Sequence, residues 1–302
     1  MLNDIAFTIL GFHPIYKREH QDERKVTLMN IKSTIRRKVR NFNVGYLIAI
    51  IFFAVLIIVP SYMLVSYFKG VMDAEAQNQQ LKNQIWRDEY DNQKNSTDWT
   101  YLPPDAPIPE DFNYNGFKDL YEQNRDFVGW LTIEDTVIDY PVMQTRLDEE
   151  YYIHRDFYHN YSSSGTLFMN AASDARIPTT NIIIFGHHMQ AGTMFGSLQK
   201  YYKNYDAYSE HKYIHFDTIW GDGEYEVVGA YYTTADDPIY DCVWIHNESE
   251  FNTIANHINS KSVFTPDSTL NYGDTFITLS TCAYHTENGR FVVIAKKTNF
   301  VG

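Results

Sequence analysis

Two residues that could carry out chemistry lie near the end of the chain. Cys282 follows the alternating run TFITLST, and Arg290 opens the next apolar run, RFVVIAKK. Both runs are typical of strands, and a short polar loop joins them. The two strands would therefore bring a thiol nucleophile and a fixed cation to the same end of a sheet, which indicates acyl transfer.

A histidine is delivered in a similar way earlier in the chain. The apolar run Ile182 to Phe185 stops at Gly186, and His187 and His188 follow. Catalytic groups often lie at the mouth of a scaffold strand, and histidine can give and accept a proton near neutral pH. Adjacent residues of an extended segment point to opposite faces, so one of the two histidines faces a given site. For Cys282, a structural role in the core is the ordinary alternative.

These segments resemble the signature of sortases, the membrane-anchored cysteine transpeptidases of Gram-positive bacteria. The matching pieces, in family order, are Gly186-His187, Leu279-Ser280-Thr281-Cys282 and Arg290. The runs FVGWLTIEDTVIDYPVMQ and EEYYIHRDFYHNYSSSGTLFMN and the helical insertion EFNTIANHINSK look like the class B subfamily. The resemblance extends over residues 115–302 and implies a closed, eight-stranded β-barrel. We choose His187 over His188 because the family pattern puts the catalytic histidine directly after glycine.

The resemblance also implies a role for each residue. Cys282 would form a thioester acyl-enzyme, His187 would protonate the departing amine and later take a proton from the incoming one, and Arg290 would hold the oxyanion or the substrate backbone. Ser280 and Thr281 resemble positions that touch substrate, although alternation along a strand equally permits a structural role.

The resemblance further implies a substrate. It would be a C-terminal sorting signal of the LPxTG or NPxTN kind, cut after its threonine, on a surface protein or pilin. The acceptor would be an amine of a peptidoglycan precursor or of a pilin.

One segment of the chain is predicted to cross a membrane. No charged residue occurs between Arg40 and Lys69, and residues 44–68 are almost wholly apolar. At about 1.5 Å per residue, such a helix spans a hydrocarbon core of about 30 Å. It starts too late and is too long for a cleaved signal peptide. Residues 1–43 hold nine basic and four acidic residues, so we expect a single-pass cell-membrane protein with a cytoplasmic N-terminus and an extracellular catalytic domain.

The remaining 259 residues carry a net charge of −18, which argues against a nucleic-acid partner. Val71 to Asn95 is polar and free of Gly and Pro, and it predicts an exposed helical stalk with a few apolar positions available for docking, such as Leu81, Ile85 and Trp86. The proline-rich run from Tyr101 to Phe112 predicts an extended linker. The expected domains are a basic cytoplasmic segment (1–43), a transmembrane anchor (44–68), a stalk with linker (69–114) and a catalytic domain (115–302).

Short strands separated by turn-rich loops predict a mainly β catalytic domain with helical additions. We expect strands at Val137 to Met143, Thr166 to Met169, Asn181 to Phe185, Tyr213 to Phe216, Tyr225 to Tyr232, Thr275 to Thr281 and Phe291 to Lys296. We expect helices at Gly116 to Asn124, Thr193 to Lys203 and Glu248 to Asn259.

Several residues are left with open roles. Cys242 could pair with Cys282 in a disulfide, although a single structural thiol is simpler. His285 and Glu287, in the loop between Cys282 and Arg290, are either a third polar group of the site or solvated. Metal-ligand spacings and phosphate-binding glycine loops are absent from the sequence, so we expect neither metal nor cofactor. A hydrolytic cysteine peptidase and a non-catalytic, membrane-tethered binding or redox domain are the alternatives.

Overall fold

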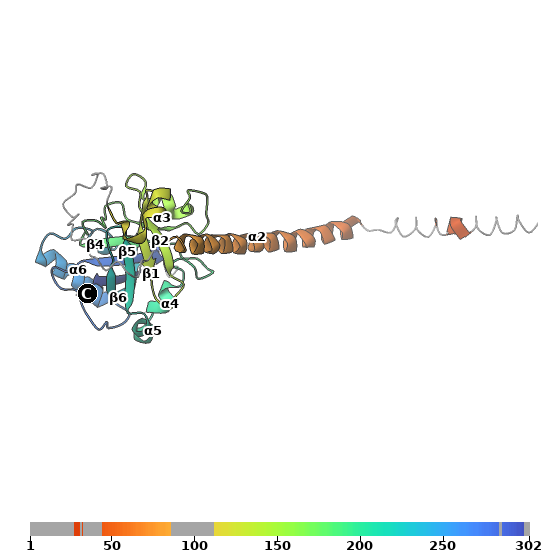
Figure 1. The fold of residues 1–302 in the computed structure, drawn as a ribbon. Helices are drawn as coiled ribbons and strands as arrows, with labels where there is room; N and C mark the ends of the chain where they lie inside the picture. Colours follow the sequence, from red (N-terminus) through yellow and green to blue (C-terminus); the bar gives the residue numbers. More distant parts are fainter. Residues whose placement is uncertain (1–26, 31, 33–43, 86–111, 284–285, 299–302) are drawn as a thin grey trace, which may run out of the picture. The chain divides into compact units, whose positions relative to one another are not determined.

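The protein is described here from a computed structural model, in which residues 27–30, 32, 44–85, 112–283 and 286–298 are placed (Figure 1). The chain forms two compact units, residues 1–66 and residues 67–302. The first unit contains residues 27–30 and 32, which are helical, and the beginning of helix α2 (Val44–Lys82). The second unit contains the end of α2 and a β-barrel with its helices.

The part of α2 in the first unit is apolar and exposed. Its side chains from Val44 to Ser66 are nearly all open to the surroundings, and the most apolar window of the helix has a mean hydropathy of 2.8 with none of it buried. Among the described residues, α2 is the one helix long and apolar enough to cross a membrane. Length and exposed apolar surface together agree with the predicted anchor.

The part of α2 in the second unit packs against the barrel. Val71, Asn78 and Leu81 are buried, and the Asn78 amide donates a hydrogen bond of 2.7 Å to the Asp139 carbonyl. Gln77 donates to the Asp156 carboxylate over 2.9 Å. The helical stalk expected from the sequence is therefore confirmed over this stretch, where Leu81 docks as expected and Asn78 is buried as well. The rest of the predicted stalk, from residue 86 on, and the linker up to residue 111 lie outside the described residues.

Eight strands close into a barrel in the order β1-β2-β3-β4-β7-β8-β6-β5, which confirms the fold that the family resemblance implied (Figure 1). The strands are β1 (Phe127–Thr132), β2 (Asp139–Met143), β3 (Leu167–Met169), β4 (Asn181–Phe185), β5 (Tyr213–Thr218), β6 (Glu224–Thr234), β7 (Phe276–Cys282) and β8 (Gly289–Lys297). Two of the pairings, β2 with β3 and β4 with β7, are parallel, and the other six are antiparallel.

Helices lie at the ends and on the outside of this barrel. They are α3 (Lys118–Gln123), α4 (Leu198–Tyr202), α5 (Tyr205–Glu210) and α6 (Glu248–Lys261), with short 3-10 helices η2 (Tyr114–Gly116), η3 (Glu149–His154) and η4 (Pro238–Tyr240). Helix α6 begins at a cap in which the Asn247 side chain accepts from the Glu250 amide, as N-cap residues commonly do. The helix predicted over residues 193–203 is shorter than expected, and α5 follows it after a separate cap at Asn204.

Strand β1 was not predicted from the sequence. It contains Gly129, and a Cβ atom there would lie 2.3 Å from the Asp217 carbonyl oxygen of the neighbouring β5. The glycine thus permits the backbones of β1 and β5 to approach closely. In the sequence, the same glycine interrupts the pattern that is typical of a strand. The seven predicted strands all overlap observed ones, and β4 has the predicted bounds.

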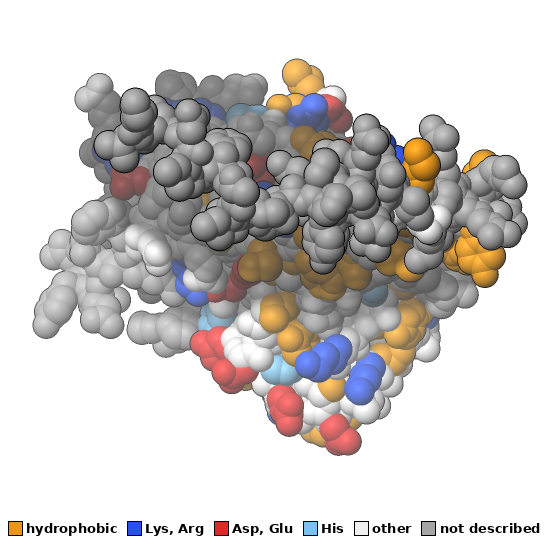
Figure 2. Space-filling model, turned by 90° about the vertical axis from the view of Figure 1, so that its right-hand side faces the viewer, with side chains coloured by type: hydrophobic (Ala, Val, Ile, Leu, Met, Phe, Trp, Pro, Cys, Tyr) orange, Lys and Arg blue, Asp and Glu red, His pale blue; other side chains and the backbone are white. Residues whose placement is uncertain are grey.

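Alternation along β7 separates the inside of the barrel from the outside. Ile277 and Leu279 belong to the core cluster that every strand of the barrel contributes to, so odd-numbered positions face inward. Phe276 belongs instead to a cluster with Phe251 and Ile258 of α6, so even-numbered positions face outward. On the face drawn in Figure 2, acidic, basic and apolar side chains of the described residues are interspersed.

Candidate active site

Cys282 and Arg290 lie directly opposite each other at one end of the barrel. They are register partners at the end of the antiparallel pair β7 and β8, as expected from the sequence. Cys282 has the outward parity of Phe276, and Arg290 has that of Val292, which packs in the same outer cluster. Both side chains are partly exposed. A thiol and a guanidinium therefore share the outer face of the sheet, within reach of solvent.

His187 is brought to the same end by the parallel pairing of β4 with β7. Phe185 pairs with Ser280, and the Gly186 amide donates a 3.1 Å hydrogen bond to the Ser280 carbonyl. His187 lies two residues beyond Phe185, as Cys282 lies two beyond Ser280, so alternation puts both on the outer face. The structure thus gathers the three predicted residues at one end of three adjacent strands. His188 has the opposite parity and forms a bridge with Met194.

The imidazole of His187 is held by the main chain of η3. Its Nε2 lies 2.6 Å from the Ile153 carbonyl oxygen, which can only accept, so Nε2 carries the proton. The His154 ring stacks on it with centroids 5.3 Å apart. Burial lowers the pKa of His187 and the charge of His154 lowers it further, against the opposing effect of the Ile153 carbonyl. The neutral ring is therefore favoured, with its free lone pair at Nδ1.

Tyr240 in η4 packs beside the strand ends that carry Cys282 and His187, and it was not predicted from the sequence. Its hydroxyl lies 2.8 Å from Ser280 Oγ, and its ring stacks on Phe185 with centroids 6.2 Å apart. Burial raises the pKa of Tyr240 to about 12, against the opposing effects of its hydrogen bond to Ser280 and of the charge of Arg290. The short run PIYDC carries no catalytic signature, so nothing in the pattern would have pointed to Tyr240.

Ser280 and Thr281 are both buried. Ser280 is 1% exposed and bound to Tyr240, whereas Thr281 is 2% exposed and has the inward parity of Leu279. Ser280 thus shares the face of Cys282, and Thr281 does not. Contact of either side chain with substrate stays a prediction.

Comparison with known proteins agrees with this geometry. A model of the sortase domain matches residues 131–298. The chain belongs to the sortase family. It is 34% identical over 182 residues to sortase B of Staphylococcus aureus, covering 60% of this chain and 73% of that protein. Sortase B of Listeria monocytogenes is 33% identical over 195 residues, covering 61% of this chain and 76% of that protein. A solved Staphylococcus aureus sortase B–substrate complex has a TM-score of 0.57 at 33% identity, covering 61% of this chain and 85% of that one.

These likenesses make the protein a class B sortase and a cysteine transpeptidase. The match includes all of β2 to β8 and ends beyond Arg290, so the three gathered residues lie inside it.

The second thiol of this sortase is separate from the site. Cys242 and Cys282 are both free, so the disulfide considered from the sequence is not formed. Cys242 is 7% exposed, and its Sγ donates to the Ile239 carbonyl over 3.1 Å. Of the two loop residues with open roles, Glu287 is exposed and His285 lies outside the described residues.

Proposed function

We propose that this sortase cuts a C-terminal sorting signal of the LPxTG or NPxTN kind after its threonine and joins the threonine to an amine. The observation that carries the proposal is the strand register, which sets Cys282 opposite Arg290 and aligns His187 beside them on one face. A nucleophile, a proton carrier and a fixed cation within one small region are what acyl transfer requires.

In the first half of the proposed reaction, Nδ1 of His187 takes the thiol proton of Cys282, and the resulting thiolate attacks the carbonyl carbon of the threonine. The C–N bond of the peptide breaks, and the departing amine takes a proton from the imidazolium of His187. A thioester between Cys282 and the threonine is left. In the second half, the nitrogen of the incoming amine attacks the thioester, His187 takes a proton from that nitrogen, and the thiolate leaves.

The environment of His187 suits these proton transfers. Because Nε2–H is occupied by the Ile153 carbonyl, Nδ1 is the nitrogen that exchanges the proton. The lowered pKa keeps the ring neutral near pH 7, so it is ready to act as a base toward the incoming amine. The main-chain carbonyl fixes the ring orientation, the task that a carboxylate performs in serine proteases.

Arg290 supplies charge without titrating. Its guanidinium is protonated at every accessible pH and has several N–H donors in a planar fork. In the proposed role, it donates hydrogen bonds to the oxyanion that forms during each attack, or to the backbone of the bound signal. Its Nη1 donates to the Gly289 carbonyl over 3.1 Å, which holds the side chain near its own strand and leaves other donors for substrate.

The membrane topology is also part of the proposal. Residues 44–68 anchor the chain, the basic residues 1–43 stay in the cytoplasm, residues 69–114 link the anchor to the catalytic domain, and residues 115–302 act outside the cell. Substrates would then be exported surface proteins or pilins, and acceptors would be amines of peptidoglycan precursors or pilins.

The test uses the full chain in detergent, because residues 71–82 pack on the barrel. Peptides carrying LPxTG-like and NPxTN-like signals are incubated with and without triglycine, and the products are identified by mass spectrometry. The proposal predicts cleavage after threonine and a triglycine-linked product. Cleavage with water alone as acceptor would indicate a hydrolytic peptidase, and no cleavage of any signal would overturn the proposed substrate.

A further inference from the structure

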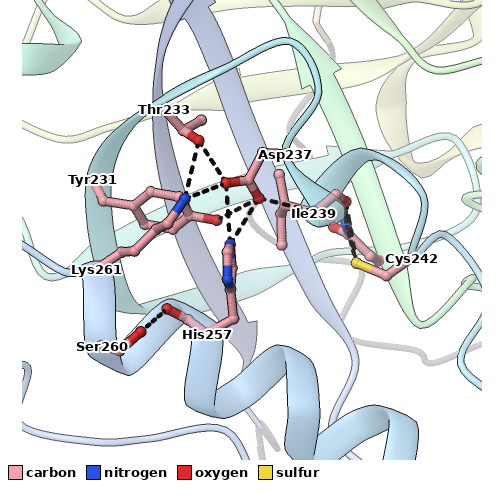
Figure 3. A network of polar contacts seen from close by, with 9 residues as sticks. Tyr231, Thr233, Asp237, Ile239, Cys242, His257, Ser260 and Lys261 are labelled. Carbon is pink, nitrogen blue, oxygen red and sulfur yellow. Dashed lines mark hydrogen bonds and ion pairs between the residues drawn. The ribbon is translucent and has the colours of Figure 1, made fainter.

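The buried carboxylate of Asp237 ties three elements together (Figure 3). The side chain of Asp237 is 0% exposed. It receives hydrogen bonds from Thr233 Oγ1 (2.5 Å), Lys261 Nζ (2.9 Å), the Ile239 amide (3.0 Å), His257 Nε2 (3.0 Å) and Tyr231 OH (3.3 Å). The donors come from the end of β6, from η4 and from α6, so one charge joins all three.

The carboxylate of Asp237 stays ionised in this setting. Burial raises its pKa, but the bonds from Thr233, the Ile239 amide and Lys261, together with the charge of His257, lower it more, to about 2. A buried charge with this many partners is costly to disturb, because removing one partner leaves the others uncompensated. A protein in which such a network is replaced by apolar residues is often no less stable than the original. Stability alone therefore does not explain why this chain has the network.

Tyr240 connects this network to the reacting groups. Asp237 caps η4 by accepting from the Ile239 amide, and Tyr240 is the next residue of that turn. Its hydroxyl bonds to Ser280 and its ring stacks on Phe185. Ser280 and Phe185 each precede a proposed reacting residue by two positions on the same face. A shift of η4 would therefore move Tyr240 relative to the strand ends that carry Cys282 and His187.

We propose that Asp237 is a positioning residue for the transpeptidation, which acts through Tyr240 by fixing η4 against β4 and β7. Lys261 and His257 serve the same end by holding Asp237 from α6. The inference rests on the proposed reaction at Cys282. The buried polar network would thus support catalysis by holding η4 in place, which the pairing of the strands alone does not do.

A double-mutant cycle tests whether Asp237 acts through Tyr240. Asp237→Asn and Tyr240→Ala are each expected to lower kcat/KM about tenfold to a hundredfold, since small misplacements near a reacting centre have effects of this size. In the Tyr240→Ala background, Asp237→Asn should lower kcat/KM by no more than about twofold further, because residues that act through one contact are not additive. Full additivity of the two losses would overturn the proposal.

A matched control separates positioning from loss of stability. Asp139 is a partly buried carboxylate on β2 that accepts from Trp130 Nε1 over 2.7 Å, away from η4. Asp139→Asn is expected to lower the melting temperature while leaving kcat/KM within about twofold of the wild type, as a destabilised but folded enzyme does. If Asp139→Asn reduces kcat/KM as much as Asp237→Asn at a temperature where both are folded, the role is merely structural.

Hydrogen exchange gives a readout that needs no activity. Asp237→Asn should speed exchange at the amides of residues 239–243 and leave β4 unchanged, whereas Asp139→Asn should not affect residues 239–243. If Asp237→Asn does not fold, Lys261→Met removes one donor and keeps the carboxylate, and the same exchange pattern is expected. Unchanged exchange in η4 would overturn the positioning role. If the wild-type protein transfers no peptide, the proposed function is contradicted. Faster exchange in Asp237→Asn would then still show that Asp237 holds η4.

Discussion

The two cysteines of this sortase show how surroundings decide what a thiol can do. Cys282 ends a strand, is partly exposed and faces Arg290 across the β7–β8 pair. Cys242 is 7% exposed and lies in a cluster under α6, with its Sγ bonded to the Ile239 carbonyl. Burial raises the pKa of Cys242 to about 12, against a smaller opposing effect of Asn181. Of the two, only the sulfur of Cys282 lies in a partly exposed side chain.

This difference is one of position in the fold rather than of local sequence. Cys242 follows η4 and packs in the core cluster under α6, so its sulfur acts as a small apolar group with one weak donor. Cys282 sits where a strand leaves the sheet, and the neighbouring strands bring Arg290 and His187 to the same edge. The reactivity that we propose for Cys282 is therefore a property of the barrel end.

Removing each thiol in turn tests the comparison most severely. Cys282→Ala should reduce transfer by about four orders of magnitude or more, since the covalent route is lost. Cys242→Ala should keep kcat/KM within about threefold and cost some stability, as small core truncations do. Transfer rates with a sorting peptide and triglycine provide the measurement. Comparable losses in the two variants would contradict the assignment of the nucleophile.

The neighbouring histidines provide a second pair. His187→Ala should lower kcat/KM by about two to four orders of magnitude, the usual contribution of a general acid and base. His188→Ala is the matched control, because it removes the same group from the opposite face of the same segment. It should retain most of the activity. A larger loss at His188 than at His187 would show that the face assignment is wrong.

The cation that Cys282 has and Cys242 lacks is tested by Arg290→Lys. The substitution keeps the charge and removes the planar fork, so a loss of about two to three orders of magnitude in kcat is expected. Arg146→Lys is a suitable control, because Arg146 pairs with Asp174 outside the site over 3.2 Å. If Arg290→Lys has the activity of the control, the hydrogen bonds of the guanidinium are not used in the reaction.

Accessibility of the thiols gives the smallest expected difference. In the native protein, iodoacetamide should modify Cys282 at least about tenfold faster than Cys242, because a buried group reacts only when the structure opens locally. In denaturant the two rates should converge. Peptide mapping by mass spectrometry follows both sites in one sample. Equal rates in the native state would contradict the burial of Cys242.

Much of the site could be predicted from the sequence because its residues lie at strand ends. The run Ile182 to Phe185 is apolar and stops at Gly186, so both the strand and the position of His187 can be read from the pattern. The same holds for Cys282 and Arg290, whose two strands are joined by a short loop. The strand order and the parallel pairing of β4 with β7 came from the structure alone, because no local pattern encodes them.

The supporting residues could not be predicted for physical reasons. The partner of His187 is the backbone carbonyl of Ile153, 34 positions away, and a carbonyl leaves no mark in a sequence. Asp237 stands in a polar loop where an exposed carboxylate is the normal expectation, and its burial depends on donors from α6. From the sequence, Asn78 is expected to be a solvated helix residue, because the Asp139 carbonyl that binds its amide is 61 positions away.

The central claim is that Cys282 carries the acyl group between donor and acceptor. The direct measurement is intact-protein mass spectrometry of the full chain after rapid mixing with a sorting peptide in the absence of an amine, followed by peptide mapping. We expect a mass increase equal to the peptide that ends at its threonine minus one water, located on Cys282, absent in Cys282→Ala and removed by adding triglycine. An adduct on Cys242, or cleavage that proceeds fully in Cys282→Ala, would contradict it.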